Sequence, residues 1–242
     1  MNETRNVVYT ASIPVRYASI AGLAGVLALT VSPVQTAGAS MPNPVTLSAL
    51  EMFLSQPTAV HPYRASRQLE ASGSGQRGWL DVHTDFTVAS GLTYEVMAEG
   101  GSGYIRTRVL RSLLNEEQRL IAQGKESTVA ISTGNYEFRP EGVNGEGLAV
   151  VGLRPLRKDR SLIDGRMFLT ILNGDLVRVE GRLARNPSFW LTRVNVVRSY
   201  QRIEGAIMPV SLETDGRLRL LGSSSLRMTY RYWQIDERPV QH

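Results

Sequence analysis

The sequence predicts a mainly β protein in which one large, curled antiparallel sheet is accompanied by two short helices. From Tyr63 onward, apolar and polar residues alternate with a period of two over most of the chain, as half-buried strands require. No repeating strand–helix–strand rhythm is present, so a parallel sheet is not expected. A sheet of ten or eleven strands curls rather than staying flat, and its concave face then offers an apolar ligand site.

The composition excludes several kinds of chemistry. The chain has 242 residues, a formal net charge of +5 and no cysteine, which rules out disulfides, cysteine metal sites and thiol catalysis. We expect no metal and no cofactor. One local basic cluster is a candidate contact for anionic headgroups or an acidic partner, and it consists of Arg154, Arg157, Lys158 and Arg160.

Residues 1–39 have the organisation of a secretory signal peptide. Arg5 and Arg16 precede an apolar run over residues 17–31, and Ala37-Gly38-Ala39 follows as the small-residue cleavage site. The run is shorter than the roughly 20 residues that a membrane-spanning helix needs. We therefore expect export to the periplasm, cleavage after Ala39 and a soluble monomer without a nucleic-acid partner. An uncleaved N-terminal anchor is the alternative.

Two helices are predicted in the remaining chain. Residues 40–62 form a leader with a short helix over residues 46–55, where Leu47, Leu50 and Leu54 recur at helical spacing. A longer helix is predicted near residues 107–122, and Gly124 ends it. Its stripe at helical spacing consists of Val109, Leu110, Leu113, Leu114, Glu117, Leu120 and Ile121.

Residues 63–242 are predicted to form one domain. Besides a strand over residues 80–88, strands are expected over residues 128–132, 135–139, 147–154, 164–172, 175–184, 190–201, 204–213, 216–221 and 225–235. Asn173-Gly174 and Asp215-Gly216 are tight-turn signals between them. Residues 72–75 and 100–103 are interpreted as hairpin turns, because they lack the lysine and the context of a phosphate-binding loop.

The C-terminal half resembles a known family. Residues 181–190 (GRLARNPSFW) are followed by residues 200–205 (YQRIEG), by Met208-Pro209-Val210-Ser211 and by a closing strand over residues 226–233. In strand order, turn dipeptides and aromatic residues, residues 63–235 resemble the outer-membrane lipoprotein-sorting proteins, the LolA-like periplasmic carriers. The resemblance implies an unclosed β-barrel, a half-pipe covered by helices, whose apolar cavity carries the acyl chains of lipoproteins. It further implies a helical lid near residues 107–122, a tethering arginine among the strand arginines, and no catalytic residue.

The leading hypothesis is therefore a non-enzymatic periplasmic carrier that reversibly binds the acyl chains of lipoproteins or another lipid. Burial of each methylene group gains about 0.8 kcal/mol, so an apolar cleft suffices for binding. A membrane complex as donor and the outer membrane as acceptor are possible partners. The cavity candidates are Leu169, Ile171, Val194, Val196, Leu226, Met228 and Tyr230. The lid candidates are Leu110, Leu113 and Leu114.

Two alternatives stay open. A non-catalytic adaptor or structural protein of the envelope would have the same fold with a filled core and no extractable ligand. An exported hydrolase of lipid or glycan would depend on Asp85 or His83, but no Gly-x-Ser-x-Gly elbow is present. Asp81, His83 and Asp85 share one strand face, yet same-face neighbours lie about 6.8 Å apart, which is far for three ligands of one metal ion.

Overall fold

The computed structural model describes residues 43–57, 60–185, 191–218 and 222–241. The predicted signal peptide, residues 1–39, lies outside the described residues. So do residues 40–42 of the predicted leader, residues 219–221 of the strand expected over 216–221, and residues 186–190 of the segment that carries the family resemblance. Within the described part of the chain, no helix has the length and apolarity needed to cross a membrane.

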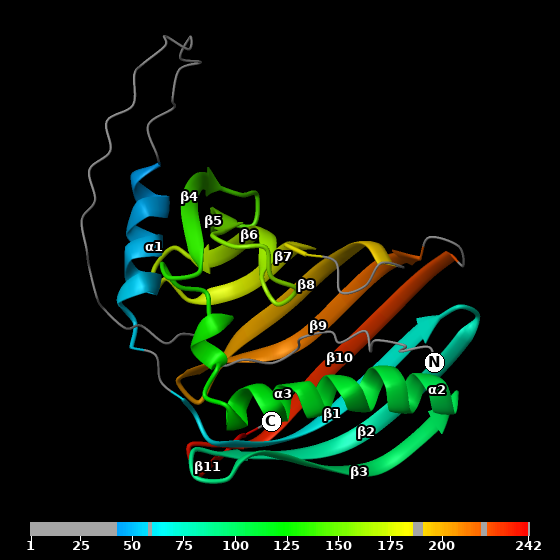
Figure 1. The fold of residues 1–242 in the computed structure, drawn as a ribbon. Helices are drawn as coiled ribbons and strands as arrows, with labels where there is room; N and C mark the ends of the chain where they lie inside the picture. Colours follow the sequence, from blue (N-terminus) through cyan, green and yellow to red (C-terminus); the bar gives the residue numbers. More distant parts are fainter. Residues whose placement is uncertain (1–42, 58–59, 186–190, 219–221, 242) are drawn as a thin grey trace.

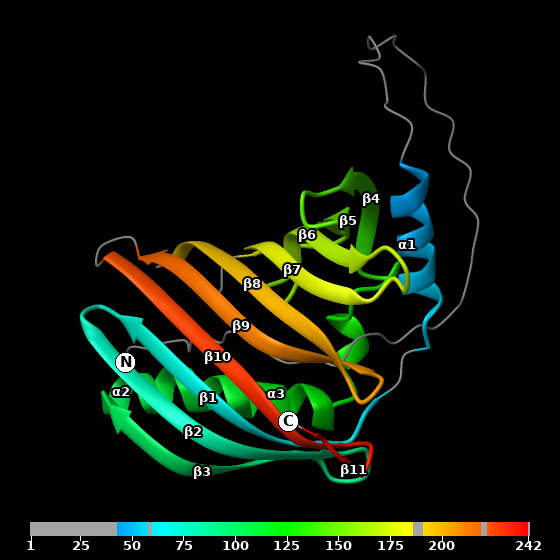
Figure 2. The ribbon, with the colours of Figure 1, turned by 180° about the vertical axis from the view of Figure 1, so that it is seen from behind.

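In the described part of the chain, eleven antiparallel strands form one curled sheet (Figures 1 and 2). Its order is β3-β2-β1-β10-β9-β8-β7-β6-β5-β4, with β11 beside β10. The strands are β1 (Tyr63–Gly73), β2 (Gln76–Thr87), β3 (Gly91–Gly101), β4 (Tyr136–Val143), β5 (Leu148–Pro155), β6 (Ile163–Thr170), β7 (Leu176–Leu183), β8 (Leu191–Ile203), β9 (Ala206–Leu218), β10 (Gly222–Ile235) and β11 (Arg238–Pro239). Among the described strands, β3 and β4 are the edges and do not pair with each other, so the sheet is not closed. The predicted fold class is confirmed.

The first helix, α1 (Pro44–Ser55), begins two residues before its predicted start. The side chain of Asn43 caps it by accepting a hydrogen bond of 3.0 Å from the Val45 N–H. Pro44 is suited to the first turn because its missing N–H has no partner there in any helix. The helix packs against β4, β5 and β6 at one end of the sheet (Figure 1).

The second helical segment is continuous from residue 103 to residue 122 and is called the long helix below. It consists of α2 (Gly103–Ile105), the π-helical η1 (Arg106–Arg111) and α3 (Ser112–Ala122). It starts four residues before the predicted start and ends, as predicted, at Gly124, whose φ is +61°. The long helix lies across the other end of the sheet, over β1, β2 and β3 (Figure 1).

The interpretation of residues 100–103 as a hairpin turn is wrong. β3 continues through Gly101, whose φ of +77° ends the strand, and the helix follows directly. Ser102 is the N-cap residue, and its hydroxyl oxygen accepts a hydrogen bond from the Ile105 N–H. The glycines therefore allow a strand to pass straight into a helix.

Two further local predictions are wrong. Asp215-Gly216 lies inside β9, where Gly216 pairs with Val194 and Ser224. The turn between β8 and β9 is Glu204-Gly205, in which both residues have a positive φ. The expected strand over residues 128–132 is replaced by η2 (Glu126–Thr128), a 3₁₀ helix, and by turns. Asn135 holds these turns by donating from its amide to the carbonyls of Ser127 and Ala130.

The predicted turn at Asn173-Gly174 is confirmed, and its glycine also contacts α1. Gly174 has a φ of +64° and is buried. A Cβ atom added there would lie 2.7 Å from both the Ala49 carbonyl oxygen and the Phe53 amide nitrogen of α1. The turn between β6 and β7 therefore supports α1 through direct backbone contact.

We expect Gly174→Ala to lower the free energy of unfolding by about 2–3 kcal/mol, because it adds a steric clash with α1 to the strain of a positive φ. Gly205→Ala is the matched control, since Gly205 has a φ of +86° but no atom within 4 Å of the added Cβ. Urea unfolding of both variants measures the difference. Equal losses would contradict the proposed contact between this turn and α1.

Candidate functional site: the sheet face under the long helix

The long helix covers an apolar face of the sheet, and the resulting cluster is called the helix core. All three lid candidates, Leu110, Leu113 and Leu114, are fully buried in it. They pack against side chains of five strands, namely Leu69, Ala71, Leu80, Val82, Val194, Val196, Leu212, Leu226 and Met228. The predicted helix is therefore present and its apolar stripe faces the sheet, and its action as a lid stays a prediction.

The predicted cavity residues divide between two cores. Val194, Val196, Leu226 and Met228 lie in the helix core, and half-buried Tyr230 packs against its border. Leu169 lies instead under α1, and half-buried Ile171 packs beside it. This second cluster is called the α1 core, and it includes Ala49, Leu50, Phe53, Tyr136, Leu162, Met167, Leu176 and Tyr200. Whether these side chains contact a ligand stays a prediction.

An ion pair is buried between the long helix and the sheet. Arg67 of β1 donates from Nη1 to Glu117 Oε2 at 2.7 Å and from Nη2 to Glu117 Oε1 at 3.2 Å. The two side chains are 0% and 2% exposed. Arg67 Nη2 also donates to the Tyr63 hydroxyl, and its guanidinium lies 4.8 Å from the centre of the Tyr230 ring. Arg67 therefore joins β1 to the long helix through its ion pair with Glu117.

The sequence contains a signal for this pair that the prediction did not use. Strand alternation places Arg67 on the same face as Ala65 and Leu69, both of which are buried. On the helix, Glu117 occupies a position in the apolar stripe, four residues after Leu113. A charged residue at an inward position on each of two facing elements indicates a buried pair, because a single buried charge is strongly unfavourable.

Polar contacts also fix the long helix to the edge strand β3. Glu99 binds Arg106 at 2.6 Å and Arg111 at 2.5 Å. The hydrogen bond from Arg111 is the main reason that the pKa of Glu99 is lowered. Further along, the Tyr94 hydroxyl donates to Asn115 at 2.8 Å, and the Gln118 amide donates to the Leu92 carbonyl at 2.9 Å. The helix is therefore held by side chains along its length.

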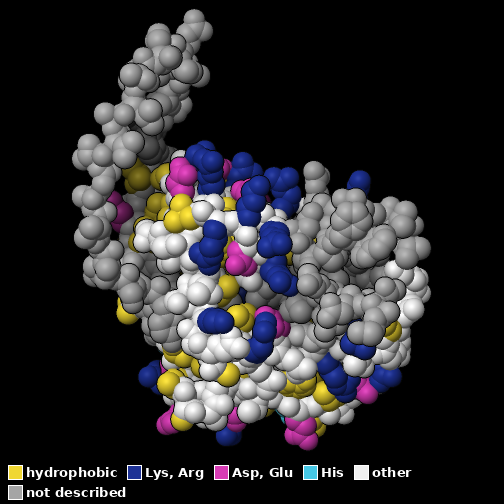
Figure 3. Space-filling model, in the orientation of Figure 1, with side chains coloured by type: hydrophobic (Ala, Val, Ile, Leu, Met, Phe, Trp, Pro, Cys, Tyr) yellow, Lys and Arg dark blue, Asp and Glu magenta, His cyan; other side chains and the backbone are white. Residues whose placement is uncertain are grey.

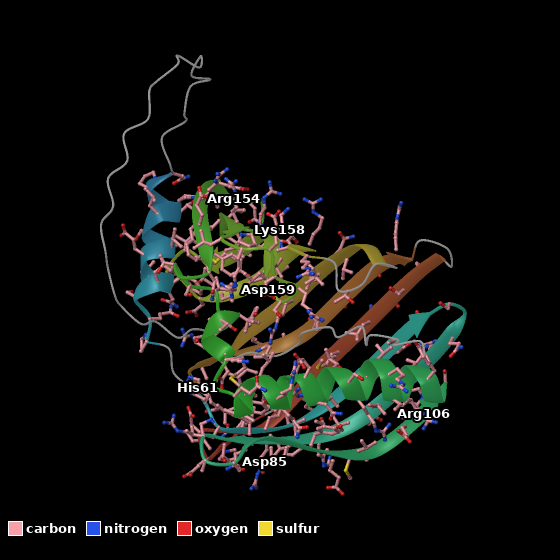
Figure 4. All side chains as sticks on the ribbon, viewed as in Figure 1. His61, Asp85, Arg106, Arg154, Lys158 and Asp159 are labelled. Atoms are coloured by element: carbon pink, nitrogen blue, oxygen red, sulfur yellow. The ribbon has the colours of Figure 1, made fainter. Side chains whose placement is uncertain are left out.

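The predicted basic cluster lies at the α1 end of the molecule, where Figure 3 shows many basic side chains and Figure 4 labels Arg154 and Lys158. Arg157 has a structural role, because its guanidinium donates to Asn135 Oδ1 at 2.6 Å and to the Thr128 carbonyl. Arg154 is 3.6 Å from Glu137. Lys158 and Arg160 are exposed and form no ion pair within the described residues.

The residues considered for metal binding or hydrolysis lie on the opposite face of β2. Asp85 accepts from Arg64 Nε at 2.8 Å, and the His83 ring stands edge-on to Trp233 with 4.9 Å between ring centres. Asp81 is half-buried on the same face. Across the described segments, no group of three or more His, Cys, Asp or Glu side chains is arranged to hold a metal ion.

No model of a known protein family matches the chain, and no curated protein does. Solved structures similar to it include a DUF1329 family protein from Desulfovibrio piger, with 10% identity and a TM-score of 0.35 over 78% of this chain and 90% of that chain. A LolA superfamily protein from Nitrosomonas europaea has 14% identity and a TM-score of 0.34 over 84% of this chain and 96% of that chain. The structure of MucB in complex with MucA(peri) has 10% identity and a TM-score of 0.20 over 78% of this chain and 92% of that chain. The superfamily that the sequence resembles is thus represented among similar solved structures.

Proposed function

We propose that this protein is a non-catalytic carrier that reversibly binds the acyl chain of a lipoprotein or another lipid between the long helix and the curled sheet. The observation that carries the proposal is the construction of the helix core. One amphipathic helix covers a wide apolar face, and it is joined to that face by side-chain contacts rather than by backbone pairing. Such a helix moves away without breaking the sheet.

Release is as important as binding for a carrier. The apolar residues of the sheet face would bury the methylene groups of the cargo at about 0.8 kcal/mol each. The polar tethers from Arg67 and from β3 return the helix to the sheet when the cargo leaves. We propose that the protein works in the periplasm after removal of residues 1–39, receiving cargo from a membrane complex and passing it to the outer membrane.

Mass spectrometry of the protein purified without detergent tests the proposal, first in the native state and then after solvent extraction. We expect a co-purifying lipid or acylated peptide and saturable uptake of a dansyl-labelled fatty acid. A clean ligand-free mass without uptake of the probe would favour the envelope adaptor instead.

Two adjacent valines on β8 point to opposite faces of the sheet, so their variants test which face binds the acyl chain. Val196 is 5% exposed and lies in the helix core, whereas Val197 is 36% exposed on the other face. We expect Val196→Thr to weaken binding of the probe severalfold, because it places a hydroxyl against the acyl chain, and Val197→Thr to leave binding unchanged. Equal effects of the two variants would exclude this face as the site.

A further inference from the structure

Arg198 is the feature of the concave face that the carrier proposal leaves unexplained. It lies on β8 between Val196, which belongs to the helix core, and Tyr200, which belongs to the α1 core. Its guanidinium lies over the Tyr200 ring, 5.3 Å from the ring centre. Nε and Nη2 are shielded from solvent, and neither has a hydrogen-bond partner among the described residues.

The charges around Arg198 do not balance. The groups that act on it electrostatically are Tyr200, Tyr230, Glu117 and Tyr232. Burial raises the pKa of Tyr200 and of Tyr232, so both hydroxyls are neutral at neutral pH. The carboxylate of Glu117 is already held through both oxygens by Arg67. Within the described residues, two guanidinium groups and one carboxylate therefore leave one positive charge on half-buried Arg198 beside an apolar face, a position that favours an anion.

We propose that Arg198 binds the oxyanion headgroup, carboxylate or phosphate, of an amphiphile whose acyl chain lies under the long helix. This inference rests on the proposed carrier function and selects anionic lipids as its cargo. A guanidinium donates two parallel hydrogen bonds to a carboxylate or a phosphate, and the free Nε and Nη2 form one such pair of donors.

The strand register places an apolar track beside this headgroup site. Arg198 pairs with Leu212, Leu212 with Met228, Met228 with Leu69, and Leu69 with Leu80. All four apolar residues are buried in the helix core. Four strand spacings amount to about 19 Å, which is comparable with the length of an extended long acyl chain. A headgroup at Arg198 thus directs its chain across the strands and beneath the long helix.

The test measures affinities for myristate, tetradecyl phosphate and tetradecanol below their micelle concentrations by displacement of a dansyl-labelled fatty acid. We expect the wild type to bind at least one of the two anions more tightly than the alcohol. We expect Arg198→Gln to weaken anion binding about tenfold to a hundredfold, the range of a charge-assisted hydrogen bond, and to leave tetradecanol binding unchanged. The anion that loses more affinity identifies the headgroup chemistry.

Arg227→Gln is the control, because Arg227 is exposed on the opposite face and pairs with Glu213 at 3.2 Å. Arg198→Gln should unfold at the wild-type temperature or above, since it removes a half-buried charge whose Nε and Nη2 have no hydrogen-bond partner among the described residues. Equal losses for myristate and tetradecanol, or no loss for either anion, would overturn the headgroup site while the carrier function stands. Failure of the wild type to bind any of the three probes would overturn both proposals. The wild-type preference for an anion over the alcohol tests the site even if the variant does not fold.

Discussion

Replacing Arg67 by methionine is expected to lower the free energy of unfolding by about 3–5 kcal/mol, because Glu117 is then left charged and buried without its main counterion. Both oxygens of that carboxylate accept hydrogen bonds from Arg67, and both side chains are excluded from solvent. The effect should be among the largest of any single substitution in the protein. Urea unfolding followed by circular dichroism measures it.

The double variant Arg67→Met/Glu117→Leu distinguishes the effect of an unpaired buried charge from the effect of lost side-chain packing. Replacement of a whole buried ion pair by apolar side chains of similar volume is often neutral or stabilising, so most of the lost stability should return. Arg227→Met is the control, because the Arg227–Glu213 pair is exposed and such pairs contribute about 0–1 kcal/mol. A double variant as unstable as Arg67→Met alone would show that the loss arises from packing and not from an isolated charge.

Removal of the tether should also change how the protein takes up acyl chains. If the open state binds the chain, then weakening the closed state raises the open population and accelerates uptake of the dansyl-labelled fatty acid. Stopped-flow mixing of the probe with Arg67→Met, at a temperature where that variant is folded, measures this rate, and the double variant is the control in which the apolar pair restores docking. An unchanged rate would mean that the ion pair stabilises the fold without controlling access to the helix core.

Leu113→Ala is expected to cost about 2–5 kcal/mol of stability, because the side chain is fully buried between the long helix and the sheet. The loss combines the transfer free energy of the removed methine and methyl groups with the free energy of the cavity that remains. Arg108→Ala is the matched control on the same helix, since Arg108 is exposed. Thermal and urea unfolding of the two variants give the comparison.

The same variant also tests whether the long helix moves as a unit. In a carrier, Leu113→Ala weakens the docked state, so probe uptake should accelerate, as is also expected for Arg67→Met. A stability loss without faster uptake would place Leu113 in a permanently packed core, as the adaptor alternative requires. A loss no larger than that of Arg108→Ala would contradict the observed docking of the helix.

Much of the fold can be predicted from the periodic spacing of apolar residues in the sequence. The wrong predictions of turns and strands occur where a local sequence pattern is compatible with two structures. Asp-Gly is a strong turn signal, yet Asp215-Gly216 lies in a strand because β9 is fixed by partners on both sides. Residues 100–103 contain three glycines, which favour a turn and equally allow the direct passage from β3 into the long helix. The apolar residues near Val129 read as a strand, although side-chain hydrogen bonds from Asn135 hold turns there.

The apolar part of the candidate site was predictable and its polar part was not. Leu110, Leu113 and Leu114 are recognisable from helical spacing alone, and all three are buried between the long helix and the sheet. The partnership of Arg67 with Glu117 joins residues fifty positions apart, so it depends on the tertiary arrangement of β1 and the helix. The placement of Leu169 under α1 and of Val196 under the long helix likewise depends on the order of the strands.

The pairing of β1 with β10 determines when the sheet is completed. Tyr63 lies opposite Ile235, so this pair joins segments about 170 residues apart in sequence, and loop closure of this length slows folding. Until the last strand arrives, β1, β2 and the long helix form a hairpin with an amphipathic helix but without β8, β9 and β10 to complete their core. The core beneath the long helix is therefore completed only when β10 has paired with β1, so early folding intermediates expose the apolar side chains of β1, β2 and the helix.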